Sequence, residues 1–163
     1  MTDHVEKACA LFKEGYNCAQ AVFGAFAEEL GIDETTALKL SSSFGGGVGR
    51  LREVCGAFSG FAMVAGLVNG YDDPDDPEAK KAHYALIQQK AVEFQKLHGS
   101  VVCREILKDT NATMTGDPDA RTPDYYAARP CLRCVMDGAI LAEEVLQPTS
   151  FSQEKEVGKK KRR

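Results

Sequence analysis

The chain has 163 residues, 44% of them hydrophobic, which suffices for one domain with a real core and is too short to favour two. The formal net charge is −4, but residues from Lys155 onward hold six Lys/Arg against one Glu, so residues 1–154 carry 14 basic and 23 acidic side chains, a net charge of −9. An acidic body of this kind excludes nucleic acid as an expected partner.

The N-terminal residues contain no basic segment followed by an apolar one. We therefore expect no secretion signal and a cytoplasmic protein. In that compartment, six cysteines are typical of reduced thiols, metal or cluster ligands, or redox-cycling pairs, and not of a structural disulfide framework. We assign residues 1–148 to a single helical domain and residues 149–163 to a basic tail, for which a flexible, solvated state is expected.

Two short helices are predicted at the start of the chain. Residues 3–14 have apolar side chains at helical spacing, and Gly15 follows where a C-cap glycine would stand. Asn17 is a good N-cap for a second helix that ends at Gly31 and carries Cys18 in its first turn. The alternative is one continuous helix kinked at Gly15, with Cys18 in its middle.

A glycine-rich loop follows a third short helix, which Asp33 or Thr35 can cap and which extends through Leu40. The loop, residues 45–49, contains four glycines and leads into a helix whose first turn carries Cys55. Glycines at this density let a backbone adopt left-handed conformations and lie close to another group. We expect the loop to be shaped around a site or a neighbouring helix.

Residues 54–71 contain no charged side chain. Their length is at the lower limit for a membrane span, but four glycines, a serine and an asparagine dilute the hydrophobicity. We therefore expect a buried central helix and no membrane span. Gly56 and Gly60 lie four residues apart on one face of this helix and would let another backbone approach closely.

The longest helix is predicted over residues 77–98, because Asp76 is an N-cap and Pro77 suits the first helical position. We expect its core stripe to contain Tyr84, Ile87, Ala91, Phe94 and Leu97. Ser100 can cap the next helix, residues 101–108, in which Cys103 is the third residue.

Residues 109–129 are polar and show no periodicity, which predicts a long surface loop of a length often used for functional lids. A last helix begins at Cys131, within the sequence Cys131-x-x-Cys134, and continues to about Leu146. No useful strand alternation is present in the sequence. The predicted fold is all-α, with about six or seven helices around the uncharged helix.

Four cysteines stand at or near predicted helix N-termini: Cys18, Cys55, Cys103 and Cys131. Any one alone is more typical of a buried core thiol. Four at helix starts indicate a pocket in which converging N-termini stabilise thiolates, which suits an iron–sulfur cluster or a reactive dithiol. N–H groups of the glycine loop, including those of Gly46 and Gly47, would then donate to the bound group. Cys9 and Cys134 are secondary candidates, and His4, His83 and His98 are interpreted as surface residues.

Five segments carry a resemblance to a known family: residues 15–22 (GYNCAQAV), 44–50 (FGGGVGR), 55–60 (CGAFSG), 99–107 (GSVVCREIL) and Cys131-x-x-x-Val135. With four cysteines and two glycine motifs in order, the chain resembles the C-GCAxxG-C-C family of small redox-active proteins. The resemblance implies a redox role for the four cysteines at the predicted helix starts. That family resembles the iron–sulfur domain of split-Soret cytochromes c, which implies an iron–sulfur cluster as the cofactor.

The chain departs from the family pattern at Leu132, where members often have proline, and in its additional Cys134. Which thiol of this pair is used therefore stays open. Three functions are compatible with the sequence: an electron-transfer or redox-sensing protein with an iron–sulfur cluster, a metal-free thiol/disulfide oxidoreductase, and a structural helical adaptor. A redox partner is expected without being identified, and a homodimer is left open.

Overall fold

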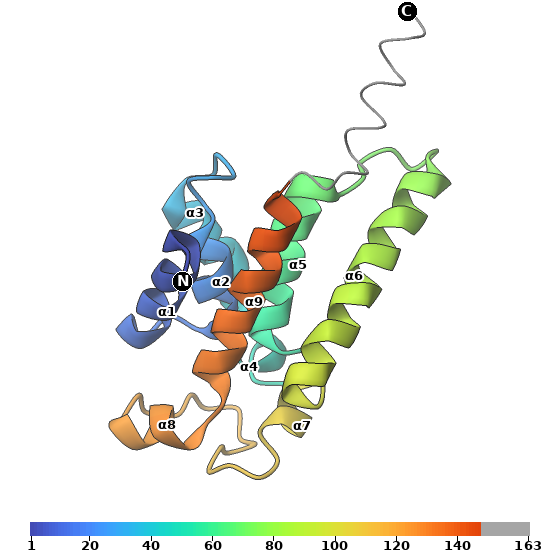
Figure 1. Ribbon diagram of the computed structural model, residues 1–163. Helices are drawn as coiled ribbons and strands as arrows, with labels where there is room; N and C mark the ends of the chain where they lie inside the picture. The colour runs from blue at the N-terminus through green and yellow to red at the C-terminus, as the bar shows by residue number, and fades with distance from the viewer. Residues whose placement is uncertain (148–163) are drawn as a thin grey trace, which may run out of the picture.

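The computed structural model describes residues 1–147, and within them it assigns helices and loops but no strand. The protein is all-α, as predicted. Six described helices have eight or more residues: α1 (Asp3–Glu14), α2 (Cys18–Ala25), α3 (Glu34–Ser41), α5 (Gly56–Asn69), α6 (Pro77–His98) and α9 (Cys131–Leu146) (Figure 1). Shorter turns are η1 (Ser42–Phe44), α4 (Gly45–Val48), α7 (Cys103–Ile106) and α8 (Pro123–Ala128). The expected basic tail, residues 149–163, lies outside the described residues.

Glycines allow α2, α5 and α9 to pack closely against one another. A Cβ atom at Gly60 of α5 would lie 2.9 Å from Val22 Cβ and 3.0 Å from the carbonyl oxygen of Ala19, both in α2. A Cβ atom at Gly138 of α9 would lie 2.8 Å from the carbonyl oxygen of Ala57 in α5. The absent side chains thus let three backbones approach each other, with α5 in the centre as predicted.

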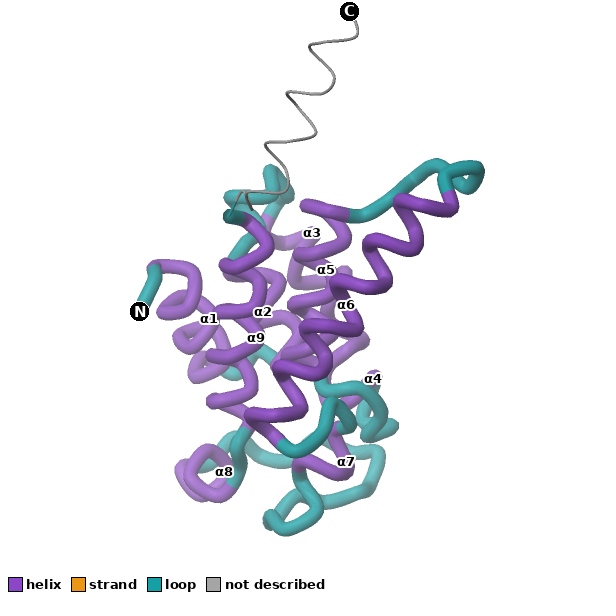
Figure 2. Tube along the Cα trace, turned by 45° about the vertical axis from the view of Figure 1, so that its right-hand side comes forward, coloured by secondary structure: helices purple, strands orange, loops and turns teal. Residues whose placement is uncertain are grey.

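The short helices α4, α7 and α8 lie together at one end of this bundle, as two views show (Figures 1 and 2). The opposite end carries the C-terminal parts of α5 and α9 (Figure 1). Between the two ends, the core is filled by phenylalanines that are at most 1% exposed: Phe12, Phe26, Phe61 and Phe94. The end formed by the short helices is where the cysteines gather.

The predicted core stripe of α6 is confirmed in part: Ile87, Ala91 and Phe94 pack against the core, whereas two other members of the stripe do not. Phe94 is the buried residue of the helix, whereas the Tyr84 and Leu97 side chains are 48% and 55% exposed. Figure 1 shows that α6 diverges from α5 toward its N-terminal end, so contact with the core is made by the part of α6 from Leu86 to Phe94. There the Phe94 ring packs on Phe58 of α5, with ring centroids 5.7 Å apart.

Local signals in the sequence set several helix boundaries. α1 and α2 are separate helices, because Gly15 adopts a left-handed φ of 110° and Asn17 and Gln20 form a capping box. α7 begins at Cys103, two residues later than predicted, because the Ser100 hydroxyl accepts a hydrogen bond from the Val102 N–H and holds that residue extended.

The 109–129 segment is not irregular throughout, because Thr122 caps the short helix α8 with Pro123 at its first position. The uncharged α5 is 14 residues long. Within residues 1–147, no helix combines the length and the apolar character needed to cross a membrane.

Replacing Gly60 by alanine tests the close contact between α2 and α5. Although alanine favours helices, we expect the variant to lose about 1–3 kcal/mol of unfolding free energy, because its methyl group overlaps Val22 and the Ala19 backbone. Gly66→Ala in the same helix is the matched control: nothing lies within 4 Å of its Cβ position, so a gain of about 0.5–1 kcal/mol is expected. Denaturant unfolding measures both, and equal effects would contradict the packing argument.

Candidate functional site

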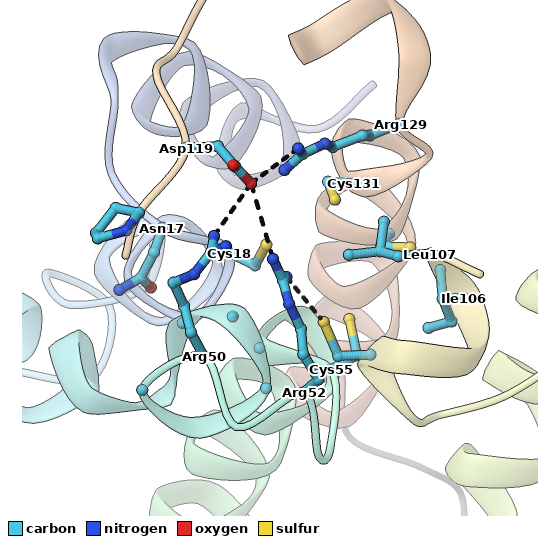
Figure 3. Close-up of a pocket in the computed structure, with 18 of the residues that line it drawn as sticks. Asn17, Cys18, Arg50, Arg52, Cys55, Ile106, Leu107, Asp119, Arg129 and Cys131 are labelled. Carbon is cyan, nitrogen blue, oxygen red and sulfur yellow. Dashed lines mark hydrogen bonds and ion pairs between the residues drawn. The ribbon is translucent and has the colours of Figure 1, made fainter. Parts of the chain in front are cut away.

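One cavity of about 310 Å³ lies at the end of the bundle where helices begin (Figure 3). Five cysteines from four helix starts line it: Cys18, Cys55, Cys103, Cys131 and Cys134. Gly46 and Gly47 line it as well, whereas Cys9 does not. The fold therefore brings the four cysteines predicted at helix starts, and the additional Cys134, to one place.

Cys18 is positioned by the cap of α2. Asn17 caps the helix, and its side-chain amide also donates a hydrogen bond of 2.9 Å to the carbonyl oxygen of Ser42, just before the glycine loop. Gly56 at the start of α5 is packed against the same point, since a Cβ there would lie 3.1 Å from Cys18 Cβ and 2.9 Å from Phe44 O. The starts of α2 and α5 are therefore locked together.

The glycine loop forms a tight left-handed turn. Positive φ angles occur at Gly46, Gly47 and Gly49, and also at Val48, Arg50 and Arg52, with values of 60–65° at the last three. Left-handed backbone at non-glycine residues costs roughly 1–2 kcal/mol each and is retained mainly where function needs it. At Gly47 a Cβ would lie 2.7 Å from Cys103 Cβ, so the loop backbone lies directly against the cysteine.

Backbone hydrogen bonds place Cys55 beside Cys103. The Cys55 N–H donates to the carbonyl oxygen of Val101 over 2.7 Å, and the Cys103 N–H donates to that of Glu53 over 2.6 Å. Residues 48 positions apart are thus joined by a single antiparallel bridge between Val54 and Val102. Both cysteines are buried, with 6% and 7% exposure.

The thiols of Cys18 and Cys131 form one hydrogen-bonded pair. The hydrogen bond lowers the pKa of Cys131, and the positive charges of Arg129, Arg121 and Arg52 lower it further. The same hydrogen bond, together with burial, raises the pKa of Cys18. Cys18 is therefore the donor of this pair, and Cys131 loses its proton at lower pH than Cys18 does.

Cys134 and Cys55 form a second pair. A hydrogen bond from Cys134 lowers the pKa of Cys55, and the Ala57 and Phe58 N–H groups at the start of α5 act in the same direction. The hydrogen bond with Cys55 and burial both raise the pKa of Cys134. In each pair, one thiol therefore loses its proton at lower pH than the other.

His98 is not the surface residue that the sequence suggested. Its side chain is 4% exposed, Nδ1 lies 3.5 Å from Cys134 Sγ, and Nε2 lies 2.9 Å from the Asp137 carboxylate. Burial lowers the pKa of His98, although Asp137 opposes this shift. His98 is the last residue of the long helix α6, one turn after Phe94, and this position puts it against α9. The sequence gave no sign of this role, because His98 does not stand at a spacing typical of metal ligands.

Arg52 contacts the thiol of Cys103. Its guanidinium donates from Nη1 to Cys103 Sγ over 3.5 Å and from Nη2 to the carbonyl oxygen of Thr113 over 2.8 Å. Burial raises the pKa of Cys103, while this hydrogen bond and the charge of Arg52 oppose the rise. Arg104, which is also next to a cysteine in the sequence, instead pairs with Glu53 on the surface and does not line the cavity.

The 109–129 segment closes over the cavity and supplies side chains that sequence reasoning missed. Asp119 accepts hydrogen bonds from Arg50 over 3.2 Å and from Arg129 over 2.9 Å, and Figure 3 shows both guanidinium groups and that of Arg52 directed at it. Burial alone would raise the pKa of Asp119, but the hydrogen bonds from Arg129, Thr113 and Arg50 hold it at about 2. In the sequence, the signal for this role was the predicted lid over residues 109–129.

Among residues 1–147, no three Cys, His, Asp or Glu side chains are grouped closely enough to hold a single metal ion. The thiols are distributed around the wall of the cavity instead. All six cysteines of the chain are free.

Comparison with known proteins assigns the family. The pattern of the family described as "Putative redox-active protein (C_GCAxxG_C_C)" matches residues 16–145, which is most of the chain. The chain belongs to this family. No curated protein and no solved structure shows significant similarity to it. All five cavity cysteines lie within the matched residues, so membership in the C-GCAxxG-C-C family supports a redox role for the cavity.

The thiol pairs predict an ordered reactivity in the reduced, metal-free protein. Because their pKa values are lowered, Cys55 and Cys131 hold more thiolate below the usual thiol pKa, and we expect their alkylation to begin at lower pH than that of Cys18 and Cys134. Mass spectrometry of iodoacetamide-labelled peptides across a pH series gives the initial rates.

The donor role of Cys18 supplies the control for this experiment. Cys18→Ala removes the hydrogen bond to Cys131 and should move the Cys131 profile to higher pH, whereas Cys18→Ser keeps a donor and should move it less. Identical profiles for all five cavity cysteines would contradict the paired arrangement.

Proposed function

We propose that the chain is a redox protein that holds an iron–sulfur cluster in its cysteine-lined cavity. The observation that carries the proposal is the meeting of five thiols, from four helix starts, around one cavity of about 310 Å³. Cysteine thiolates are the usual protein ligands of such clusters. Ligands on a single tetrahedral metal ion lie about 2.3 Å from it, whereas thiols spread around a cavity suit a larger inorganic core.

The ligands in this proposal are Cys18, Cys55, Cys103 and Cys131. They come from the starts of α2, α5, α7 and α9, so each thiolate lies near N–H groups that have no partner within the helix. Cys134 lies one turn further along α9 and is engaged with Cys55 and His98. We therefore treat it as the fifth thiol, which supports Cys55 by hydrogen bonding.

The protein around the thiols can support a negatively charged cofactor. When bound, the cluster supplies one-electron transfer. Gly46 and Gly47 bring backbone, without side-chain bulk, to the cavity wall, and Arg52 donates a hydrogen bond to Cys103. Hydrogen bonds to ligand sulfurs and the burial of the site are the main means by which a protein sets a cluster potential.

A second candidate function is thiol–disulfide exchange, which the pairing of Cys18 with Cys131 favours. Both are partly exposed, unlike Cys55, Cys103 and Cys134. The Cys131 thiolate would attack a disulfide of a partner protein and release one partner thiolate. Cys18 would then attack the mixed disulfide, which releases the second partner thiolate and leaves a Cys18–Cys131 disulfide, while the Cys18 proton passes to a released thiolate.

Both candidates need thiols that stay reduced. The proposal therefore includes the cytoplasm as the compartment, because reducing conditions there preserve six free cysteines. It also includes a protein or small-molecule redox partner that exchanges electrons with the cavity.

Anaerobic purification followed by iron and sulfide analysis and an absorption spectrum tests the cluster. We expect iron and sulfide in a fixed ratio to protein and visible charge-transfer absorption. Cys55→Ser should abolish this absorption, because it removes a buried ligand at the start of α5. Cys9→Ser is the matched control and should leave the spectrum unchanged, since Cys9 does not line the cavity.

The same measurement on Cys131→Ser and Cys134→Ser decides which thiol of that pair is the ligand, and we expect loss for the first and retention for the second. If anaerobic protein carries no iron and its Cys18 and Cys131 thiols cycle reversibly through a disulfide, the exchange candidate replaces the cluster. Absence of both iron and reversible thiol oxidation would leave a structural adaptor.

A further inference from the structure

The side of the cavity formed by the 109–129 segment and the glycine loop is strongly cationic. Four arginines line the cavity, namely Arg50, Arg52, Arg121 and Arg129, and Asp119 is the one carboxylate among the described residues that line it. Asp119 pairs with Arg50 and Arg129, and it lies 3.8 Å from Arg52. One negative charge is therefore shared among three guanidinium groups.

Arg52 retains an unused donor. Its side chain is 6% exposed, and its Nε has no hydrogen-bond partner within the described part of the chain. Leaving a buried donor without a partner is energetically costly, most of all on a charged group, so an acceptor is expected to satisfy it. Arg52 is also held in a left-handed backbone conformation, with φ at 60°, which adds to the cost of keeping it there.

Within residues 1–147, no carboxylate pairs with the charge of Arg121. Its guanidinium donates to the carbonyl oxygens of Phe12 and Tyr16 and lies 4.8 Å from the ring centre of Tyr125. Arg129 also lies over the Tyr125 ring, with its guanidinium carbon 4.1 Å from the ring centre. Carbonyl oxygens and an aromatic ring thus fix the two cations before any ligand arrives.

We propose that this arginine cluster binds a small molecule carrying an oxyanion group, of carboxylate, phosphate or sulfate type, beside the Cys18–Cys131 pair. Guanidinium groups match such oxygens with two parallel donors. A volume of about 310 Å³ is at the small end of ligand pockets, which selects a small metabolite and not a polymer. That this molecule is the redox substrate rests on the proposed function, whereas its binding does not.

Isothermal titration of the full-length protein with phosphate, sulfate, acetate and succinate tests the proposal, with iron content determined on the same anaerobic samples and sodium chloride held constant. At least one probe should saturate a single site. Arg52→Gln should raise the dissociation constant of that probe about tenfold or more, as expected for loss of a buried charged donor. The best probe identifies the type of oxyanion.

Arg104→Gln is the matched control, because it removes a positive charge next to Cys103 but outside the cavity. The affinity of this variant for the probe should stay within about twofold of that of the unchanged protein. Arg129→Gln is a second cavity variant if Arg52→Gln fails to fold by circular dichroism. No saturable binding, or equal weakening by the cavity and surface variants, would overturn the anion site. The titration is run on iron-containing and on iron-free protein, so that failure of the anion site is distinguished from failure of the cluster proposal and from a cluster that fills the same cavity.

Discussion

The close contact of α2, α5 and α9 determines the rest of this structure. Gly56, Gly60 and Gly138 stand where any side chain would overlap a neighbouring backbone or Cβ atom. With the helix backbones this close, the starts of α2, α5 and α9 meet at one end of the bundle, and the bridge between Val54 and Val102 adds the start of α7. Cysteines more than a hundred residues apart thus share a cavity without any local ligand motif.

Charge is balanced across this cavity by two kinds of donor. Hydrogen bonds from neighbouring thiols lower the pKa of Cys55 and Cys131, and N–H groups at the start of α5 act in the same direction on Cys55. The arginines that follow the glycine loop and those of the 109–129 segment add full positive charges. Asp119 orders those arginines without neutralising them. An acidic protein therefore encloses a cationic, thiol-rich site, an arrangement suited to holding negative charge that varies with redox state.

Much of this fold could be read from the sequence, because caps and glycines act locally. Asn17, Pro77 and Gly15 set helix ends as expected, and the family resemblance was confirmed over residues 16–145. The exposure of Tyr84 and Leu97 could not be read, since periodicity does not say which part of a helix reaches the core. The roles of Asp119, Arg129 and His98 depend on how segments distant in sequence fold over the cavity. Such long-range packing leaves no periodic pattern in the sequence.

Disulfide mapping after mild oxidation of the metal-free protein tests the central claim, that helix starts distant in sequence form one thiol site. The account predicts intramolecular links between Cys18 and Cys131 and between Cys55 and Cys134, with Cys9 left as a free thiol in the monomer. Links that involve Cys9, or only links between molecules, would show that the five thiols do not meet and would contradict the account.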